Sequence, residues 1–490
     1  MGTGTMQAER QDLLIDGGWT SGKSGRSFEN LHPYTGEVVG SAVAAGPEDA
    51  QAAVDSAAKA FPSWSSTPPG ARREMLGEAA RLLLERGPQL AATMTEETGS
   101  TFGWGMFNVE LAAAVLREAA AQTYALVGEV IPSDVPGKLA MGVRQPVGVV
   151  VGIAPWNAPL ILAARAVATP LAYGNTVVLK ASEQCPRTHA GIATTLADAG
   201  VPSGVVNFIT NDPADAPEVV EALIAHPRTR RINFTGSTKV GRIIAEKAGR
   251  HLKRVLLELG GKAPLVILAD ADIDRAVAAA KFGAFMHQGQ ICMSTERIVV
   301  DASVADEFAG KLGERAAELK VGDPREPETQ IGPLINSGAL QKIEELVDDA
   351  VGKGAAVVAG GAAEGPCFQP TVLLGVTPEM RVYHEESFGP VLSIIAVEDD
   401  EQAVRTANDT EYGLSAAVFS RDVSRAMEVA QRIESGICHI NDTTVHDEPQ
   451  MPFGGVKDSG WGRFGGNAAI QEFSELRWIT VQGLPREYPI

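Results

Sequence analysis

The chain has 490 residues, of which 44% are hydrophobic and 21% charged, a usual composition for a globular α/β protein with two or three domains. Aspartate and glutamate together number 61, lysine and arginine 42, so the formal net charge is −19. Such an acidic surface repels phosphate backbones and anionic lipids, which argues against nucleic-acid and membrane partners.

Cysteine and histidine usage predicts neither a disulfide framework nor a metal site. The four cysteines lie far apart without a C-x-x-C pair, which fits a reduced cytoplasm, and the eight histidines show no H-x-x-x-H pattern. The N-terminal stretch MGTGTMQAERQDLL lacks a basic segment followed by an apolar one, so we expect no secretory signal.

Residues 46–124 are predicted to be mostly helical. Pro47, Glu48 and Asp49 open one helix, and alanine-rich amphipathic runs follow at 71–86 and 108–125. From residue 143 the pattern changes to alternating strands and helices. In order, these segments are VRQPVGVVVGIAP, PLILAARAVATPLAYG, NTVVLKAS, THAGIATTLADAG, VVNFIT, RRINFTGS and KVGRIIAEKAG, followed by RVLLELGG. The alternation predicts a parallel sheet with helices on both faces.

The uncharged stretch from residue 146 to 164 is long enough to cross a bilayer. Prolines at positions 146, 155 and 159 interrupt it, however, and Trp156-Asn157 lies in its middle. Because proline disrupts a helix interior, a buried strand, a turn and a buried helix explain this stretch better than a membrane span.

A second α/β pattern begins with the strand APLVILAD and the helix DIDRAVAAAKFGAF, which Asp272 caps. Alternation continues to about residue 440, so we expect a second domain with its boundary near Gly260-Gly261. The glycine- and proline-rich stretch 448–466 also carries phenylalanine and tryptophan, and is predicted to be a long ordered loop.

Three residues are candidates for catalysis. Cys292 in GQICMSTER is a possible nucleophile if a base generates its thiolate, although a single cysteine in an apolar context is more often structural. Glu258 ends an apolar strand, where burial would raise its pKa and suit it to general-base work; the alternative is a salt bridge to Lys262. Asn157 follows a buried strand and could donate to an oxyanion, or could be a turn residue or helix cap.

Two segments suggest a dinucleotide site. FTGSTKVG (234–241) follows a strand and opens a helix, whose N-terminal N–H groups near Gly236 can hold pyrophosphate, although the pattern is not G-x-G-x-x-G. Lys180 and Glu183 end a strand, where a carboxylate can accept from ribose hydroxyls; the alternative is a solvated charge pair.

Together and in this order, these segments resemble the aldehyde dehydrogenase superfamily from about residue 12 to 480. The matching segments are PWN (155–157), KASE (180–183), FTGS (234–237), ELGGK (258–262), GQIC (289–292), EESFGP (385–390) and PFGGVKDSG (452–460). The resemblance implies an α/β aldehyde dehydrogenase fold with a Rossmann-like cofactor domain, a second α/β catalytic domain and a small β oligomerisation element. The implied ranges are 1–124, 144–259 and 447–474 for the cofactor domain, 260–446 for the catalytic domain, and 125–143 and 475–490 for the oligomerisation hairpin, strand and tail.

The resemblance also implies residue roles. Cys292 attacks the aldehyde, Asn157 holds the oxyanion, hydride passes to the nicotinamide, and Glu258 activates water to hydrolyse the resulting thioester. The implied cofactor contacts are Trp156, Lys180, Ser182, Glu183, Gly236, Ser237, Glu386 and Phe388. The charge of Glu183 would repel a 2′-phosphate, which favours NAD, with NADP as an alternative because some relatives with this glutamate use it.

Three longer segments look most like the salicylaldehyde, vanillin and benzaldehyde dehydrogenase branch: MGVRQPVGVVVGIAPWNAPLIL, RRINFTGSTKVGRIIAEKA and FMHQGQICMSTERIVV. This likeness implies an aromatic aldehyde as the small-molecule substrate, in a pocket lined by Leu162, Arg165 and Phe453. Arg165 would contact a ring hydroxyl or carboxylate, or else form an ion pair at the domain surface.

The sequence is also compatible with other substrates and with another class of enzyme. An aliphatic aldehyde or succinate semialdehyde is the alternative substrate, and a cofactor-free cysteine hydrolase is a more remote alternative that would leave the dinucleotide signals without a purpose. By resemblance we expect a cytoplasmic homodimer or homotetramer, assembled through a hairpin near 125–145 and a strand near 476–483.

Overall fold

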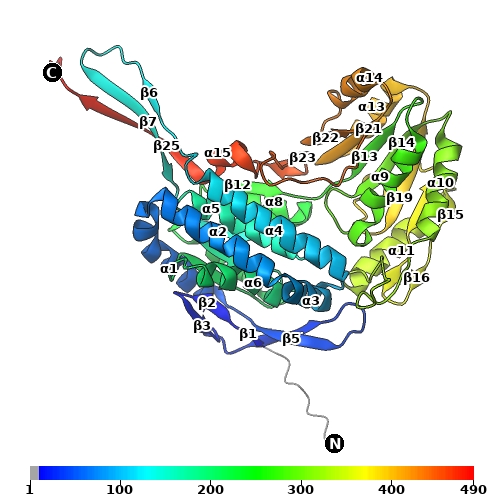
Figure 1. Ribbon diagram of the computed structural model, residues 1–490, viewed down its shortest axis with the longest axis horizontal. Coiled ribbons are helices and arrows are strands. Elements are labelled where there is room, and N and C mark those ends of the chain that lie inside the picture. Colours follow the sequence, from blue (N-terminus) through cyan, green and yellow to red (C-terminus); the bar gives the residue numbers. More distant parts are fainter. Residues whose placement is uncertain (1–9) are drawn as a thin grey trace, which may run out of the picture.

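The structure, a computed structural model, describes residues 10–490. Most of the stretch considered above for a secretory signal, residues 1–9, lies outside the described residues. Two large sheets, each covered by helices, make up most of the molecule, and a β-ribbon projects from one end (Figure 1).

The first large sheet has eight strands in the order β24-β12-β11-β8-β9-β10-β2-β3. Its strands are β24 (Gly460–Trp461), β12 (Arg254–Glu258), β11 (Thr229–Thr235), β8 (Val149–Ile153), β9 (Thr176–Lys180), β10 (Val206–Ile209), β2 (Leu13–Ile15) and β3 (Gly18–Thr20). The five central strands, β12 to β10, are parallel, and antiparallel strands close both edges. Strands β8 and β9 are buried along their whole length because helices cover both faces of the sheet.

Successive residues of β8 point into opposite cores. Val150 packs in one core with helices on one face, while Val149 and Val151 pack in the core on the other face. The first core contains α2 (Pro69–Glu85), α3 (Gly87–Thr98), α4 (Phe102–Gln122), α5 (Pro159–Ala172) and α6 (Pro186–Asp198). The second contains α1 (Pro47–Ser66), α7 (Ala216–Ala225), which follows η1 (Pro213–Asp215), and α8 (Thr238–Arg250).

The second large sheet has seven strands in the order β15-β18-β19-β14-β13-β21-β22. They are β15 (Ala356–Ala359), β18 (Thr371–Leu374), β19 (Val391–Val397), β14 (Thr295–Asp301), β13 (Ala263–Ile267), β21 (Ser415–Phe419) and β22 (Ile437–Ile440). The accompanying helices are α9 (Ile273–Phe285), η2 (Met286–Gly289), α10 (Ala305–Ala317), α11 (Ser337–Gly352), α12 (Arg381–His384), α13 (Asp400–Asn408) and α14 (Val423–Ala430). All its strands except β15 pair in parallel.

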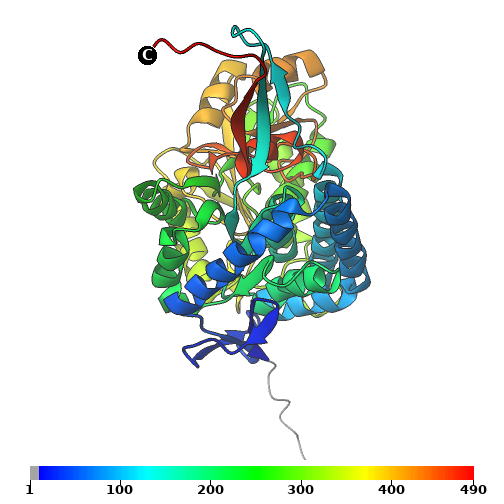
Figure 2. The same ribbon diagram turned by 90° about the vertical axis from the view of Figure 1, so that its left-hand side faces the viewer.

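Short strands and the projecting ribbon complete the chain. The ribbon consists of β6 (Glu129–Ile131), β7 (Lys138–Pro146) and β25 (Ser474–Gln482), and the chain ends beyond its far end (Figures 1 and 2). The remaining elements are β1 (Arg10–Gln11), β4 (Ser27–Leu31), β5 (Val38–Val43), β16 (Ala363–Glu364), β17 (Cys367–Phe368), β20 (Tyr412–Gly413), β23 (Val456–Lys457), η3 (Gly466–Ala469) and α15 (Ile470–Phe473).

The predicted secondary structure is largely confirmed. The segment 46–124 forms four helices, and Asp272 caps α9 by accepting a hydrogen bond from the Arg275 N–H. The uncharged stretch 146–164 becomes β8, a turn and the first part of α5, and no helix among residues 10–490 is long and apolar enough to span a membrane. The boundaries between domains stay a prediction.

Candidate active site

The three predicted catalytic residues come from separate elements that meet between the two large sheets. Asn157 lies in the turn between β8 and α5, Glu258 ends β12, and Cys292 lies in the loop between η2 and β14. The Asn157 side-chain amide donates to the carbonyl of Gln290, at 3.0 Å, two residues before the cysteine. Asn157 is thus a turn residue, as one alternative predicted, but a buried one, and it does not cap α5, a position that Ala158 occupies.

Glu258 is a buried carboxyl group, 2% exposed, and neither of its oxygens has a hydrogen-bond partner among the described residues. Burial raises its pKa well above the ordinary range, and the nearby Arg165 and Arg463 oppose that shift only in part. This direction agrees with the rise in pKa that the sequence predicts for a buried Glu258. The alternative salt bridge is wrong, because Lys262 pairs with Glu296 at 2.6 Å instead.

Cys292 is partly exposed on the wall of a cavity of about 760 Å³. Burial of the sulfur raises the pKa of the thiol to about 12, and the neighbouring Glu258 charge adds to the shift. The resting thiol is therefore protonated near neutral pH, so attack on a substrate requires a base that accepts its proton.

The loop that leads to Cys292 has an unusual backbone. His287, Gln288 and Gly289 all have positive φ angles, of 49°, 56° and 69°. A β-carbon on Gly289 would lie 2.2 Å from the carbonyl oxygen of Gly389, so only glycine fits there. The Gln290 side chain fixes the loop further, since its oxygen accepts from the Ile335 N–H at 3.0 Å. Such strained segments persist only where their surroundings hold them, and they gather at functional sites.

The cavity beside Cys292 also contains the predicted substrate residues. Leu162, Arg165 and Phe453 all line it, together with Asn157. The Arg165 guanidinium lies 4.4 Å from the centre of the Phe453 ring and forms an ion pair with Asp447. That pair is buried in the cavity wall rather than placed at the surface.

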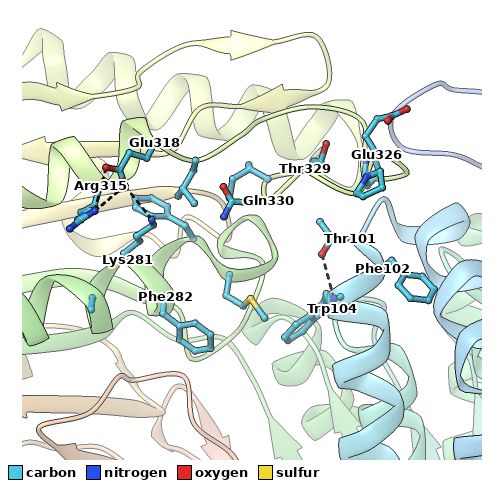
Figure 3. A pocket seen from close by; sticks show the side chains of 18 of the residues that line it. Thr101, Phe102, Trp104, Lys281, Phe282, Arg315, Glu318, Glu326, Thr329 and Gln330 are labelled. Atoms are coloured by element: carbon cyan, nitrogen blue, oxygen red, sulfur yellow. Dashed lines mark hydrogen bonds and ion pairs between the residues drawn. The ribbon is translucent and has the colours of Figure 1, made fainter.

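A larger cavity, of about 1550 Å³, lies next to the first and shares Trp104, Phe282 and Met286 with it (Figure 3). Charged side chains, including Lys281, Arg315 and Glu318, surround part of it. Because none of the predicted catalytic or cofactor residues line this cavity, it is not the candidate reaction site.

Lys180 and Glu183 form an ion pair at the carboxyl end of β9. The same carboxylate oxygen of Glu183 accepts from the Asn211 side chain at 3.0 Å. Burial acts to raise the pKa of Glu183, but Lys180 and these hydrogen bonds outweigh it and keep the pKa below its ordinary value. The pair is mostly buried, with exposures of 6% and 20%, so the solvated-pair alternative does not hold. Ser182 is buried beside it, and its N–H donates to His189.

Gly236 and Ser237 lie at the start of α8, where Ser237 caps the helix by accepting from the Val240 N–H. The first N–H groups of a helix have no partner within it and attract anions such as pyrophosphate. The strands β8, β9, β10 and β11 are parallel, so this helix start and Glu183 lie at the same edge of the sheet. This arrangement fits a dinucleotide.

The other predicted cofactor residues lie close to the start of the second sheet. The Glu386 carboxylate accepts from the Gly261 N–H at 2.9 Å, and burial raises its pKa to about 7. Phe388 contacts Trp156 edge to face, with ring centres 5.7 Å apart. Reasoning from the sequence did not single out Asn211, Asp447 or Trp104, which contact these sites from distant segments.

Comparisons with known proteins agree with this geometry. The sequence profile of the aldehyde dehydrogenase family matches residues 19–479. The chain is 59% identical over 478 residues to a vanillin dehydrogenase of a Pseudomonas species, covering 98% of this chain and 99% of the relative. It is 46% identical to a crystal structure of a salicylaldehyde dehydrogenase from Pseudomonas putida complexed with salicylaldehyde, with a TM-score of 0.97 and coverage of 98% and 100%.

A second similar structure is a betaine aldehyde dehydrogenase from Staphylococcus aureus in complex with NAD⁺, at 33% identity and a TM-score of 0.94, covering 97% of this chain and 98% of the other. The sequence match, the shared fold and the arrangement of the site lead to one conclusion. The chain is an enzyme that belongs to the aldehyde dehydrogenase family.

Proposed function

We propose that this enzyme oxidises aromatic aldehydes to carboxylic acids, with NAD as the hydride acceptor and Cys292 as the nucleophile. The convergence of Cys292, Asn157 and an apolar wall on one cavity carries the proposal. The vanillin and salicylaldehyde dehydrogenases among its relatives support an aromatic substrate. A cavity with apolar walls and few polar groups suits a flat ring.

In the first step a water molecule accepts the Cys292 thiol proton and passes it to solvent, the sulfur bonds to the aldehyde carbon, and the carbonyl π electrons move to the oxygen, which becomes an oxyanion. The Asn157 side-chain amide has two N–H donors; one is directed at the Gln290 carbonyl, which leaves the other for this oxygen. The residues around Glu183, Ser237 and Glu386 would hold NAD, which would supply the hydride acceptor.

Loss of the hydride leaves a thioester on Cys292. Ionised Glu258 takes a proton from a water molecule, whose oxygen bonds to the thioester carbon, and the Cys292 thiolate leaves as the carboxylic acid forms. The raised pKa of Glu258 makes it a stronger base than an exposed carboxylate. Cysteine catalysis thus divides one oxidation into two easier steps.

The cofactor preference rests on the charge of Glu183. Its pKa is lowered, so it is ionised at neutral pH and would repel the 2′-phosphate of NADP. We assign Arg165 a corresponding role in substrate preference. Its position in the cavity wall supports contact with a ring hydroxyl or carboxylate.

We also propose a cytoplasmic homo-oligomer with the domain ranges given above. The ribbon of β6, β7 and β25, which projects from the molecule (Figure 1), supports assembly because it also exposes apolar side chains. Those side chains are Val130, Ile131, Leu139, Leu476, Trp478 and Val481. All four cysteines are free thiols, which supports a reduced compartment.

The proposal is tested by following NADH formation with a panel of aromatic aldehydes, aliphatic aldehydes and succinate semialdehyde. We expect the highest kcat/KM with aromatic aldehydes and no turnover in Cys292→Ala. Cofactor binding, followed by fluorescence quenching, should persist in that variant. No reduction of NAD or NADP with any aldehyde would overturn the proposal.

A further inference from the structure

Trp104, near the start of α4, contacts Asn157 through a hydrogen bond between distant parts of the chain. Its indole N–H donates to the Asn157 backbone carbonyl at 3.1 Å. The tryptophan is 4% exposed, and Thr101 fixes the helix start by accepting from the Trp104 backbone N–H. A single buried donor therefore holds the backbone of the residue that carries the proposed oxyanion donor.

The indole ring of Trp104 also contacts the loop that leads to Cys292. It stacks on His287, with ring centres 5.0 Å apart and an angle of 12° between the planes. His287 is 3% exposed, has a positive φ angle, and has no hydrogen-bond partner for either ring nitrogen among residues 10–490. Aromatic contacts with Trp104 and Trp156, rather than hydrogen bonds, thus fix the position of its ring.

We propose that Trp104 is a positioning residue that sets the distance between the oxyanion donor Asn157 and the nucleophile Cys292. The indole N–H fixes Asn157, and the indole ring, through His287, fixes the strained segment that ends at the cysteine loop. The hydrogen bond from the Asn157 side chain to the Gln290 carbonyl links these two contacts directly. This inference rests on the proposed function, because it assumes that Asn157 binds the oxyanion.

The position of Trp104 gives this contact a second consequence. Trp104 lines the cavity that contains Cys292 and also the larger cavity beside it (Figure 3). A substrate ring packed against the indole therefore has a fixed position relative to the oxyanion donor Asn157. Since a small displacement of reacting groups slows a reaction strongly, loss of the indole N–H should lower kcat more than it raises KM.

Trp104→Phe tests the proposal, because phenylalanine keeps an aromatic ring and removes the donor. We expect kcat for an aromatic aldehyde to fall about 10-fold, the size expected for one hydrogen bond, with KM changed less than about 2-fold. Trp64→Phe is the matched control: Trp64 is 1% exposed, lies in α1, and its indole nitrogen has no hydrogen-bond partner in the described chain. Its kcat should remain that of the wild type.

A double-mutant cycle separates positioning from a purely structural role. In an Asn157→Ala background, which alone should lower kcat by about 10²–10³, Trp104→Phe should cause little further loss. Full additivity, or a KM change without a kcat change, would overturn the inference. If Trp104→Phe does not fold, His287→Leu, which removes the ring stacked on Trp104 and leaves the indole N–H in place, tests the ring contact in the same cycle, with Trp156→Phe as the control for the second ring that His287 contacts. Full activity in Asn157→Ala itself would instead overturn the proposed function.

Discussion

Arg165 and Asp447 form a buried ion pair in the wall of the cavity that contains Cys292. The second carboxylate oxygen of Asp447 has no hydrogen-bond partner among residues 10–490 and is buried. Both charges act on the catalytic groups: Arg165 lowers the pKa values of Glu258 and Cys292, and Asp447 raises them. The pair therefore belongs to the electrostatics of the reaction site as well as to its shape.

Replacing Arg165 alone should affect both stability and substrate choice. Arg165→Leu leaves Asp447 as an unpaired buried charge, which should lower the free energy of unfolding by about 3–5 kcal/mol. The kcat/KM ratio between hydroxylated and plain benzaldehydes should fall about 10-fold or more, because a hydrogen bond to a charged group is lost. Denaturant unfolding and steady-state kinetics measure the two effects.

The double variant Arg165→Leu/Asp447→Leu is the control for that experiment. It removes the unpaired charge, so it should recover most of the lost stability without recovering the discrimination between substrates. Unchanged discrimination in Arg165→Leu would show that Arg165 does not contact the substrate ring.

Glu258→Gln should separate thioester formation from thioester hydrolysis. The amide cannot accept a proton, so we expect an initial burst of NADH followed by turnover about 10²–10⁴ times slower than in the wild type. Because the base acts when ionised and its pKa is raised, wild-type kcat should increase with pH well above the ordinary range of a carboxylate. Stopped-flow measurement across pH gives both results.

Glu472→Gln provides a matched control for this pH dependence. Burial also raises the pKa of Glu472, but this residue lies in α15, and Glu258, not Glu472, is among the charges that act on the Cys292 thiol. The variant should keep the wild-type profile of kcat against pH. A Glu258→Gln enzyme with full steady-state turnover would remove Glu258 from the mechanism.

The sequence predicted those features that depend on local pattern. The buried strand before Asn157, the helix that starts after Ser237 and the cap at Asp272 follow from hydrophobic runs and capping residues within a few positions. Strands β1 to β5 were not predicted. Each is only two to six residues long, and in most of them buried and exposed side chains do not alternate regularly.

Contacts between distant segments could not be predicted in this way. Asp447 lies 282 positions from Arg165, and Trp104 lies 53 positions from Asn157. No periodicity within either segment indicates its partner, since the pairing depends on how the two sheets and α4 pack together. The resemblance to a family supplied the catalytic roles, but the residues that support them emerged only from the fold.

The charge of Glu183 should determine the preference between NAD and NADP. Glu183→Gln removes the negative charge and weakens the hold on Lys180, whose ammonium is then free to attract a 2′-phosphate. We expect the ratio of kcat/KM for NAD to kcat/KM for NADP to fall about 10-fold, because one charge interaction with the 2′-phosphate is changed. Fluorescence titration with each cofactor, in the absence of aldehyde, should show the same shift in Kd. A wild-type preference for NADP of tenfold or more would contradict the role proposed for Glu183.

Glu386 should make the stability of the protein depend on pH in a direction opposite to that of most carboxylates. Its folded-state pKa is raised, chiefly by burial, from 4.5 to about 7, so the folded protein holds this proton more tightly than the unfolded chain. The resulting stabilisation is fully present below pH 4.5 and is lost as pH rises through about 7. At 1.36 kcal/mol per pKa unit, this amounts to roughly 3 kcal/mol.

Urea unfolding of wild type and Glu386→Gln at several pH values between these limits measures the effect. The raised pKa of Glu258 makes the same contribution to the pH dependence of unfolding in both proteins. The difference between their curves of unfolding free energy against pH therefore isolates Glu386. The adjacent Glu385 is the matched control: a hydrogen bond from Arg381 lowers its pKa, so its contribution is present above its unfolded pKa and is lost as pH falls. Stability curves for wild type and Glu386→Gln that stay parallel from pH 4.5 to 7 would show that burial does not hold a proton on Glu386.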